Sequence, residues 1–141
     1  MTTIPGDIVV GLGCSTAASA GEIICLIETC LIEANLGANR IAAFGTHARK
    51  RDSLALLQAA AHFNLPLRFL EDSDLASGVP GTCEAVSAAA GPLLLAKRKS
   101  RYATCAIALA APGFDASDFG QPSSPSATIA SSMLATSLAG P

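Results

Sequence analysis

The sequence predicts an α/β protein: a three-layer α/β/α domain around a mixed, mostly parallel five-stranded sheet. Short apolar runs alternate with amphipathic helical segments through the first part of the chain, which is typical of parallel strands joined by crossover helices. The last two apolar runs are separated only by a short basic segment. That spacing predicts an antiparallel hairpin at the end of the sheet.

The composition agrees with a single domain that has an apolar core. The chain has 141 residues, of which 50% are hydrophobic, and a formal net charge of −2. A slightly acidic chain argues against nucleic acid as a partner. The longest apolar run, around residues 85–96, is broken by Gly91 and Pro92 and is too short to span a bilayer. Residues 1–7 lack the features of a secretion signal, so we expect a cytoplasmic protein with no membrane partner.

The first predicted unit is a strand, a glycine-rich turn and a helix. Ile8–Val10 is a β-branched run suited to a buried strand, and Gly11–Cys14 is expected to turn sharply. Ser19 and Glu22 have the spacing of a capping box at the start of a helix that ends near Asn35. The N-terminus of such a helix, beside a glycine-rich turn, attracts carboxylates or phosphates.

The remaining elements continue the alternation. We expect further strands at residues 40–46, 65–70, 93–96 and 104–109, and further helices at residues 54–63 and 83–90. Asp52 or Ser53 is the N-cap of the second helix, and Thr82 is that of the third. From residue 112 onward Ala, Ser, Thr, Pro and Gly dominate. We therefore expect a domain over residues 1–111 and a flexible tail over residues 112–141 that is dispensable for folding and binding.

Two cationic clusters follow predicted strands. Seven of the nine basic residues lie in residues 49–51 and 97–101. Ligands of α/β sheets bind outside the carboxyl ends of the strands, so the clusters meet the glycine-rich turn if the fourth strand runs parallel to the first two. This arrangement predicts a site for a ligand with several carboxylates or phosphates. The predicted ligand-binding residues are Gly11, Gly13, Cys14, Ser15, Thr46, Arg49, Lys50, Lys97, Arg98, Lys99 and Ser100.

The candidates for catalysis are His47, Cys14 and Glu84. His47 follows the second strand, and Cys14 lies near a helix N-terminus, a setting that can activate a thiol. Cys14 is equally explained as a small residue in a tight turn, and Glu84 as a carboxylate that compensates a helix dipole. No cysteine pair has CxxC spacing, and the chain lacks a dinucleotide fingerprint and a phosphate-loop motif. We expect no metal and no cofactor.

Four ordered blocks resemble the cobalamin biosynthesis family that contains CobE and the C-terminal domain of CbiG. The first block is Val10–Cys14 with residues 19–23, and the others begin at Thr46, Leu65 and Glu84. The resemblance covers residues 7–110 and implies a small α/β/α protein of the corrin ring pathway. CbiG-type proteins open a lactone on a cobalt-precorrin. The family usually has basic residues where this chain has Ser15 and Thr16.

The resemblance implies a precorrin-type tetrapyrrole as the ligand. A precorrin carries many acetate and propionate arms, which agrees with the two cationic clusters. The first hypothesis is a carrier or accessory protein that binds such an intermediate and works with other cobalamin-pathway enzymes. One alternative is a precorrin-modifying hydrolase that uses His47, Cys14 or Glu84. The other is a generic α/β domain that binds a small anionic metabolite.

Overall fold

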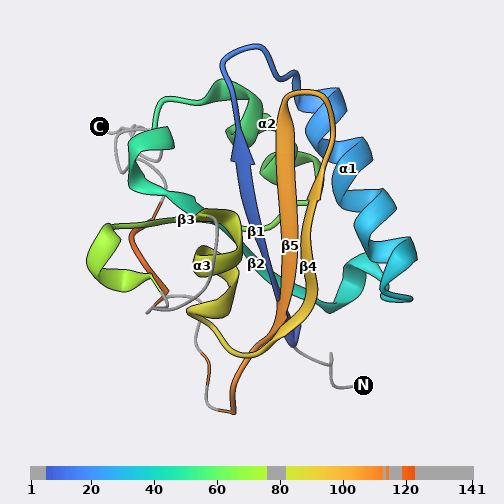
Figure 1. Cartoon of the computed structure of the whole chain (residues 1–141), viewed down its shortest axis with the longest axis vertical. Helices are drawn as coiled ribbons and strands as arrows, with labels where there is room; N and C mark the ends of the chain where they lie inside the picture. The colour runs from blue at the N-terminus through green and yellow to red at the C-terminus, as the bar shows by residue number, and fades with distance from the viewer. Residues whose placement is uncertain (1–5, 76–81, 113, 115–118, 123–141) are drawn as a thin grey trace, which may run out of the picture.

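The protein folds around a five-stranded sheet flanked by helices on both faces (Figure 1). A computed structural model describes residues 6–75, 82–112, 114 and 119–122. The strands and helices are β1 (Ile8–Cys14), α1 (Ala20–Glu33), β2 (Ile41–His47), α2 (Leu54–His62), β3 (Leu67–Leu70), α3 (Thr82–Ala88), β4 (Leu93–Lys99) and β5 (Ala103–Leu109). The short 3₁₀ helices are η1 (Ala38–Arg40), η2 (Ala48–Lys50) and η3 (Asp72–Asp74).

The sheet order is β3-β2-β1-β5-β4. The pairs β1–β2 and β2–β3 are parallel, whereas β5 is antiparallel to both β1 and β4. The predicted α/β fold and the terminal hairpin are therefore confirmed. Because β5 runs opposite to both of its neighbours, β4 points in the same direction as β1. The carboxyl ends of β1, β2 and β4 consequently meet at one edge of the sheet.

Alternating side chains of β1 separate the two faces of the sheet. Val10 and Leu12 belong to the large apolar cluster that also contains the buried residues of α1 and α2. Val9 points to the other face, where it packs with Val86 of α3 in a smaller cluster. Figure 1 shows α3 in front of the sheet and α1 along one side. This alternation is the period of two that a strand covered on both faces requires.

The strand β1 continues through Gly11 and Gly13, where the sequence predicted a turn. Its pairing with β5 extends to Cys14, which lies opposite Ala103. The physical reason is packing: a Cβ atom on Gly11 would lie 2.2 Å from the carbonyl oxygen of Cys83. The glycine lets α3 approach the strand closely, and the chain turns only after Cys14.

The strand β4 also runs further than predicted, because it includes Lys97, Arg98 and Lys99. A β-bulge lies between Leu95 and Arg98, which pair with Ile107 and Cys105. The extra residue places Leu95 in the large cluster and Arg98 on the same face, where it pairs with Glu33 of α1. The side chains of Lys97 and Lys99 therefore lie on the opposite face of the sheet, which α3 covers.

The helix caps follow the sequence closely. Ser19 Oγ accepts a hydrogen bond from the Glu22 amide at 3.1 Å, and Ser53 Oγ accepts one from the Leu56 amide at 3.3 Å. Ser53 rather than Asp52 is thus the N-cap of α2. Asn35, with φ of 58°, ends α1 in the left-handed conformation. The predicted third strand starts two residues later than expected, at Leu67.

Part of the predicted tail packs against the sheet. Phe119 is buried with Val9, Leu70 and Val86. Gln121 exchanges two backbone hydrogen bonds with Phe69, with N···O distances of 2.7 and 2.8 Å. Phe119 and Gln121 therefore contact the sheet, although they lie beyond the domain boundary predicted at residue 111. Residues 123–141, the greater part of the predicted tail, lie outside the described residues.

Candidate functional site: a cationic hollow at the strand ends

A hollow of about 430 Å³ opens at the edge where β1, β2 and β4 end. This is the volume of a typical small-molecule pocket. Its walls come from the ends of these strands, from η2, from the start of α3 and from the β4–β5 turn. The lining residues are Leu12, Gly13, Cys14, Ser15, Thr46, His47, Arg49, Lys50, Cys83, Lys97, Lys99, Ser100, Arg101, Tyr102, Ala103 and Thr104.

The charge on this hollow is entirely positive. Its basic side chains are Arg49, Lys50, Lys97, Lys99 and Arg101. No carboxylate is among its lining residues, and none of these five cations makes an ion pair within the part of the chain that the structure describes. Cations grouped in this way repel each other, and an anionic ligand relieves that repulsion.

The basic residues away from the hollow are engaged elsewhere. Arg40 pairs with Asp7, Arg51 with Glu71 and Arg98 with Glu33. Arg68 donates to the carbonyl oxygens of Phe119 and Gly120, at 2.7 and 3.1 Å. The five basic residues that line the hollow make no such ion pair with a described residue.

Most of the predicted ligand-binding residues line this hollow, but Gly11 and Arg98 do not. Gly11 lies beneath α3, where its missing side chain makes room for the helix. Arg98 points to the opposite face, and its Nη2 atom lies 2.6 Å from Glu33 Oε2. Sequence proximity to Lys97 and Lys99 misplaced Arg98 because the bulge in β4 changes which residues share a face.

Three hydroxyls of the hollow serve the fold. Thr46 Oγ1 donates a hydrogen bond of 2.8 Å to the carbonyl oxygen of Leu12 and so ties β2 to β1. Ser100 Oγ donates to the carboxylate of Glu22. Ser15 Oγ accepts a hydrogen bond from the Ala17 amide at 3.3 Å. Tyr102 and Thr104 also line the hollow, so a ligand meets hydroxyl groups as well as ammonium and guanidinium groups.

His47 is held by both ring nitrogens. Its Nε2 atom lies 2.6 Å from Asp72 Oδ1, and its Nδ1 atom accepts a hydrogen bond from the Arg49 amide at 3.1 Å. The amide fixes Nδ1 as the acceptor, so Nε2 carries the proton toward Asp72. His47 thereby caps η2 and shapes the Arg49–Lys50 segment. These bonds occupy the atoms that proton transfer to a ligand would need.

Cys14 and His47 line the same hollow but share no hydrogen bond among the described residues, and Glu84 lies outside the hollow. Cys14 Sγ lies 3.6 Å from Ser53 Oγ at the start of α2. Glu84 is only 8% exposed and lies outside the hollow, where its Oε2 atom accepts a hydrogen bond from the Lys97 amide at 2.9 Å. Each of the three candidates therefore has a structural role in the described part of the chain.

Several lining residues were missed by the sequence analysis. Arg101 lines the hollow and belongs to the second cationic cluster, so its place in that cluster could have identified it as a site residue. Arg101 stacks over the Tyr102 ring, with its Cζ atom 5.4 Å from the ring centroid. Cys83 and Thr104 meet the hollow only because α3 packs on β1 and β5, so the sequence carries no local signal for them. Burial raises the pKa of the Cys83 thiol, which argues against a thiolate there.

Glu22 holds the cationic hairpin turn in place. Its carboxylate accepts hydrogen bonds from Ser100 Oγ and, at 2.6 Å, from the Tyr102 amide. Ser15 adds a third tie, because its amide donates to the Tyr102 carbonyl at 2.8 Å. The capping box predicted from Ser19 and Glu22 is thus only half formed, since Glu22 reaches the turn instead of its own helix. This clamp positions Lys99 and Arg101.

The Glu22 clamp predicts a pH-dependent contribution to stability. The hydrogen bond from Ser100, followed by that from Tyr102, lowers the pKa of Glu22 below its ordinary value of 4.5. Because the pKa of Glu22 is lower in the folded state than in the unfolded state, its carboxylate stabilises the fold at pH values above the unfolded-state pKa. This stabilisation is lost as the pH falls through the folded-state pKa. We expect Glu22→Gln to lower the midpoint of thermal unfolding at neutral pH, with the difference shrinking toward about pH 3.

The control for this prediction is Glu28→Gln. Glu28 is exposed on the same helix and makes no ion pair or hydrogen bond with the described residues. Its replacement should leave the midpoint of thermal unfolding unchanged at neutral pH. A Glu22→Gln difference that stays constant with pH would contradict a role of the carboxylate charge in the clamp.

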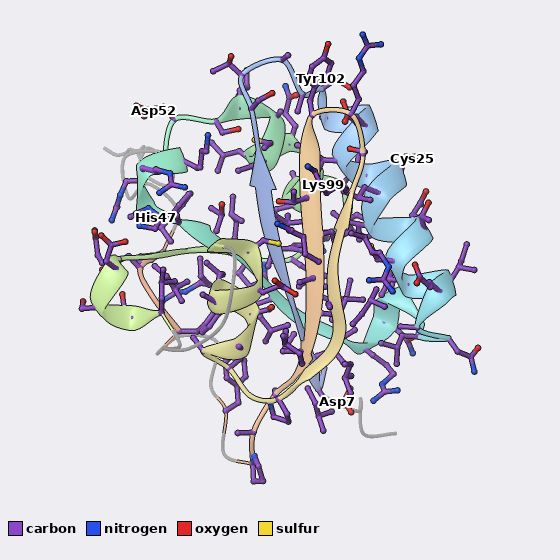
Figure 2. The ribbon with its side chains drawn as sticks, in the orientation of Figure 1. Asp7, Cys25, His47, Asp52, Lys99 and Tyr102 are labelled. Carbon is purple, nitrogen blue, oxygen red and sulfur yellow. The ribbon has the colours of Figure 1, made fainter. Side chains whose placement is uncertain are left out.

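A second hollow, of about 470 Å³, adjoins the first. The two share Cys14, Ser15, Arg49 and Lys50. The remaining walls come from the β1–α1 loop and the start of α2, namely Thr16, Ala18, Asp52, Ser53, Leu54 and Ala55. Figure 2 shows Asp52 and Tyr102 toward the same end of the molecule, opposite Asp7. Because they share four residues, the two hollows form one continuous surface.

Neither a metal cluster nor a membrane helix is found in the described segments. No three His, Cys, Asp or Glu side chains there are grouped to hold a metal ion. Every helix of those segments is too short or too polar to cross a bilayer.

Comparison with known proteins gives the family. The structure is similar to that of CobE, a protein from the cobalamin (vitamin B12) biosynthetic pathway, with a TM-score of 0.66 and 25% identity over 79% of this chain and 95% of that one. It shares its fold with the cobalamin biosynthesis protein ChiG from Agrobacterium tumefaciens, with a TM-score of 0.64 and 23% identity over 74% of this chain and 98% of that one. No curated protein matches the sequence.

The family relationship covers the part of the chain that forms the sheet and the hollow. Residues 8–108 match the family described as the cobalamin synthesis G C-terminus. This range runs from the first residue of β1 to within one residue of the end of β5. The chain thus belongs to the cobalamin synthesis G C-terminus family and takes part in cobalamin biosynthesis.

Proposed function

We propose that this protein binds a precorrin-type polycarboxylate tetrapyrrole and acts as its carrier or accessory protein in the corrin ring pathway. The observation that carries the proposal is the hollow with five basic side chains and no carboxylate in its lining. Precorrins carry several carboxylate arms, and cations pair with such arms at partly exposed sites. The family and its CobE relative supply the pathway.

Binding explains the site better than catalysis. A hydrolase needs a nucleophile or water activated by a base within hydrogen-bond reach. Here His47 is held by Asp72 and Arg49, and Glu84 is held by Lys97. An intermediate bound at this open surface remains accessible to a second protein. The partners of the proposed carrier are therefore the ligand and an enzyme of the same pathway.

Strand β4 provides a matched set of variants for testing the proposal. Lys97 and Lys99 line the hollow, whereas Arg98 pairs with Glu33 on the opposite face. We expect hydrogenobyrinic acid to bind the wild type at micromolar concentration and more weakly at high salt. Lys97→Ala/Lys99→Ala should weaken binding about tenfold, measured by calorimetry and visible absorbance. Arg98→Ala removes a charge from the same strand and should leave the Kd unchanged.

The outcomes of this titration separate the alternatives. Equal losses in the Lys97/Lys99 and Arg98 variants would indicate a general charge effect instead of a site. If the wild type does not bind hydrogenobyrinic acid, the proposal is contradicted. The alternative of a generic α/β domain that binds a small anionic metabolite then remains. Chemical turnover of the ligand by the wild type, lost in His47→Ala while binding persists, would instead support the hydrolase alternative.

A further inference from the structure

The second hollow differs in chemistry from the first. Its wall beyond the shared residues includes the apolar side chains of Ala18, Leu54 and Ala55, together with the polar residues Thr16, Asp52 and Ser53. Leu54, the first residue of α2, is 65% exposed. The large apolar side chains exposed in the described part of the chain are Ile32, Leu54, Leu94 and Tyr102. Leu54 and Tyr102 line the two adjoining hollows, whereas Ile32 and Leu94 line neither.

The two hollows together match an amphipathic ligand. The first hollow presents cations, among them Lys97 and Lys99, and the second presents Leu54 beyond the shared Arg49 and Lys50. A flexible polycarboxylate without a ring pairs with the cations but makes no apolar contact with Leu54. A ligand that also has a large apolar ring gains contact with Leu54, because removing that side chain from water is favourable.

We propose that Leu54 is a specificity-determining residue that contacts the apolar ring edge of a macrocyclic polycarboxylate held by the cationic hollow. This inference rests on the proposed function, and it adds where the ring of the bound macrocycle lies on the protein. The carboxylate arms lie against Lys97 and Lys99, and the ring edge crosses the shared Cys14–Ser15 segment to reach Leu54. Leu54 thus separates ring-containing polycarboxylates from open-chain ones, which the cations alone do not distinguish.

The test compares two ligands on three variants of the full chain. The ligands are hydrogenobyrinic acid, which has the ring, and butanetetracarboxylate, which has none. We expect Leu54→Ala to weaken binding of the macrocycle about fivefold and to leave the open-chain ligand unchanged. Leu54→Met keeps the apolar volume and should bind the macrocycle like the wild type. Ile32→Ala truncates an apolar side chain on α1 that is even more exposed than Leu54, and it should change neither Kd.

Each outcome either supports or overturns the role of Leu54. Macrocycle binding that is unaffected by Leu54→Ala but weakened by Lys97→Ala/Lys99→Ala overturns this inference and keeps the proposed function. Equal weakening of both ligands by Leu54→Ala shows that the substitution disturbs Arg49 and Lys50, and it also overturns the inference. Absence of macrocycle binding by the wild type overturns the proposed function and the role of Leu54 with it.

Discussion

Gly11→Ala is expected to lower the free energy of unfolding by about 3 kcal/mol, as overpacking in a close-packed core does. The new methyl group would lie 2.2 Å from the Cys83 carbonyl oxygen and 3.1 Å from Ser87 Cβ. The first of these atoms is backbone and cannot move without shifting α3. Ser87 is fully buried and donates to the Cys83 carbonyl at 3.1 Å, so the helix is locally tied as well.

Urea denaturation of Gly11→Ala, with Gly21→Ala as the control, checks this prediction. A Cβ atom on Gly21 would meet nothing closer than Ser19 Oγ at 3.9 Å. Alanine is favoured over glycine in a helix, so Gly21→Ala should not destabilise the protein. If Gly11→Ala stays within about 0.5 kcal/mol of the wild type, α3 does not pack closely on β1.

Phe119→Ala is expected to cost about 3 kcal/mol of unfolding free energy, the range for removing a buried phenylalanine ring. The ring is only 6% exposed and packs with Val9, Leu70 and Val86. It also occupies space beside Gly45, where an added Cβ would lie 2.8 Å from its Cε2 atom. The loss of this ring opens a cavity between the sheet and α3.

Leu94→Ala is the control for Phe119→Ala. Leu94 is a large apolar residue of β4 that is 46% exposed, so its truncation should cost well under 1 kcal/mol. Both variants are compared by urea denaturation under the same conditions. A Phe119→Ala protein as stable as the wild type would favour the original expectation that the chain after residue 111 is dispensable.

The sequence predicted the order of elements because their signals are local. The apolar run at residues 8–10 and the caps Ser19 and Ser53 all act within their own segments. Gly11 and Gly13 were misread because glycine has two uses. It permits a turn, and it also permits the close approach of another element. The elements packed beside the glycines decide between these uses, namely α3 beside Gly11 and Thr104 of β5 beside Gly13. Their positions depend on the tertiary fold.

The site was predicted in outline, and its errors have identifiable causes. The carboxyl-end rule and the clustering of cations predicted that Arg49, Lys50, Lys97 and Lys99 lie together, and these four residues line one hollow. The β4 bulge moved Arg98 to the other face, and bulges leave no pattern in apolar–polar alternation. The role of Glu22 was missed because its partners, Ser100 and Tyr102, lie far away in the sequence. Phe119 was missed because a single aromatic residue in an Ala/Ser-rich stretch resembles a tail.

The central position of β1 has a consequence for the order of folding. Its antiparallel partner β5 is the last of the five sheet strands in chain order, and Ile8 of β1 pairs with Leu109 of β5. Closing so long a loop carries a larger entropic cost than forming the local β4–β5 hairpin. During synthesis the cationic hairpin can form by itself, but Cys14 and Ser15 join it only after β5 has emerged. Ligand binding would therefore distinguish completely folded chains from partly folded ones.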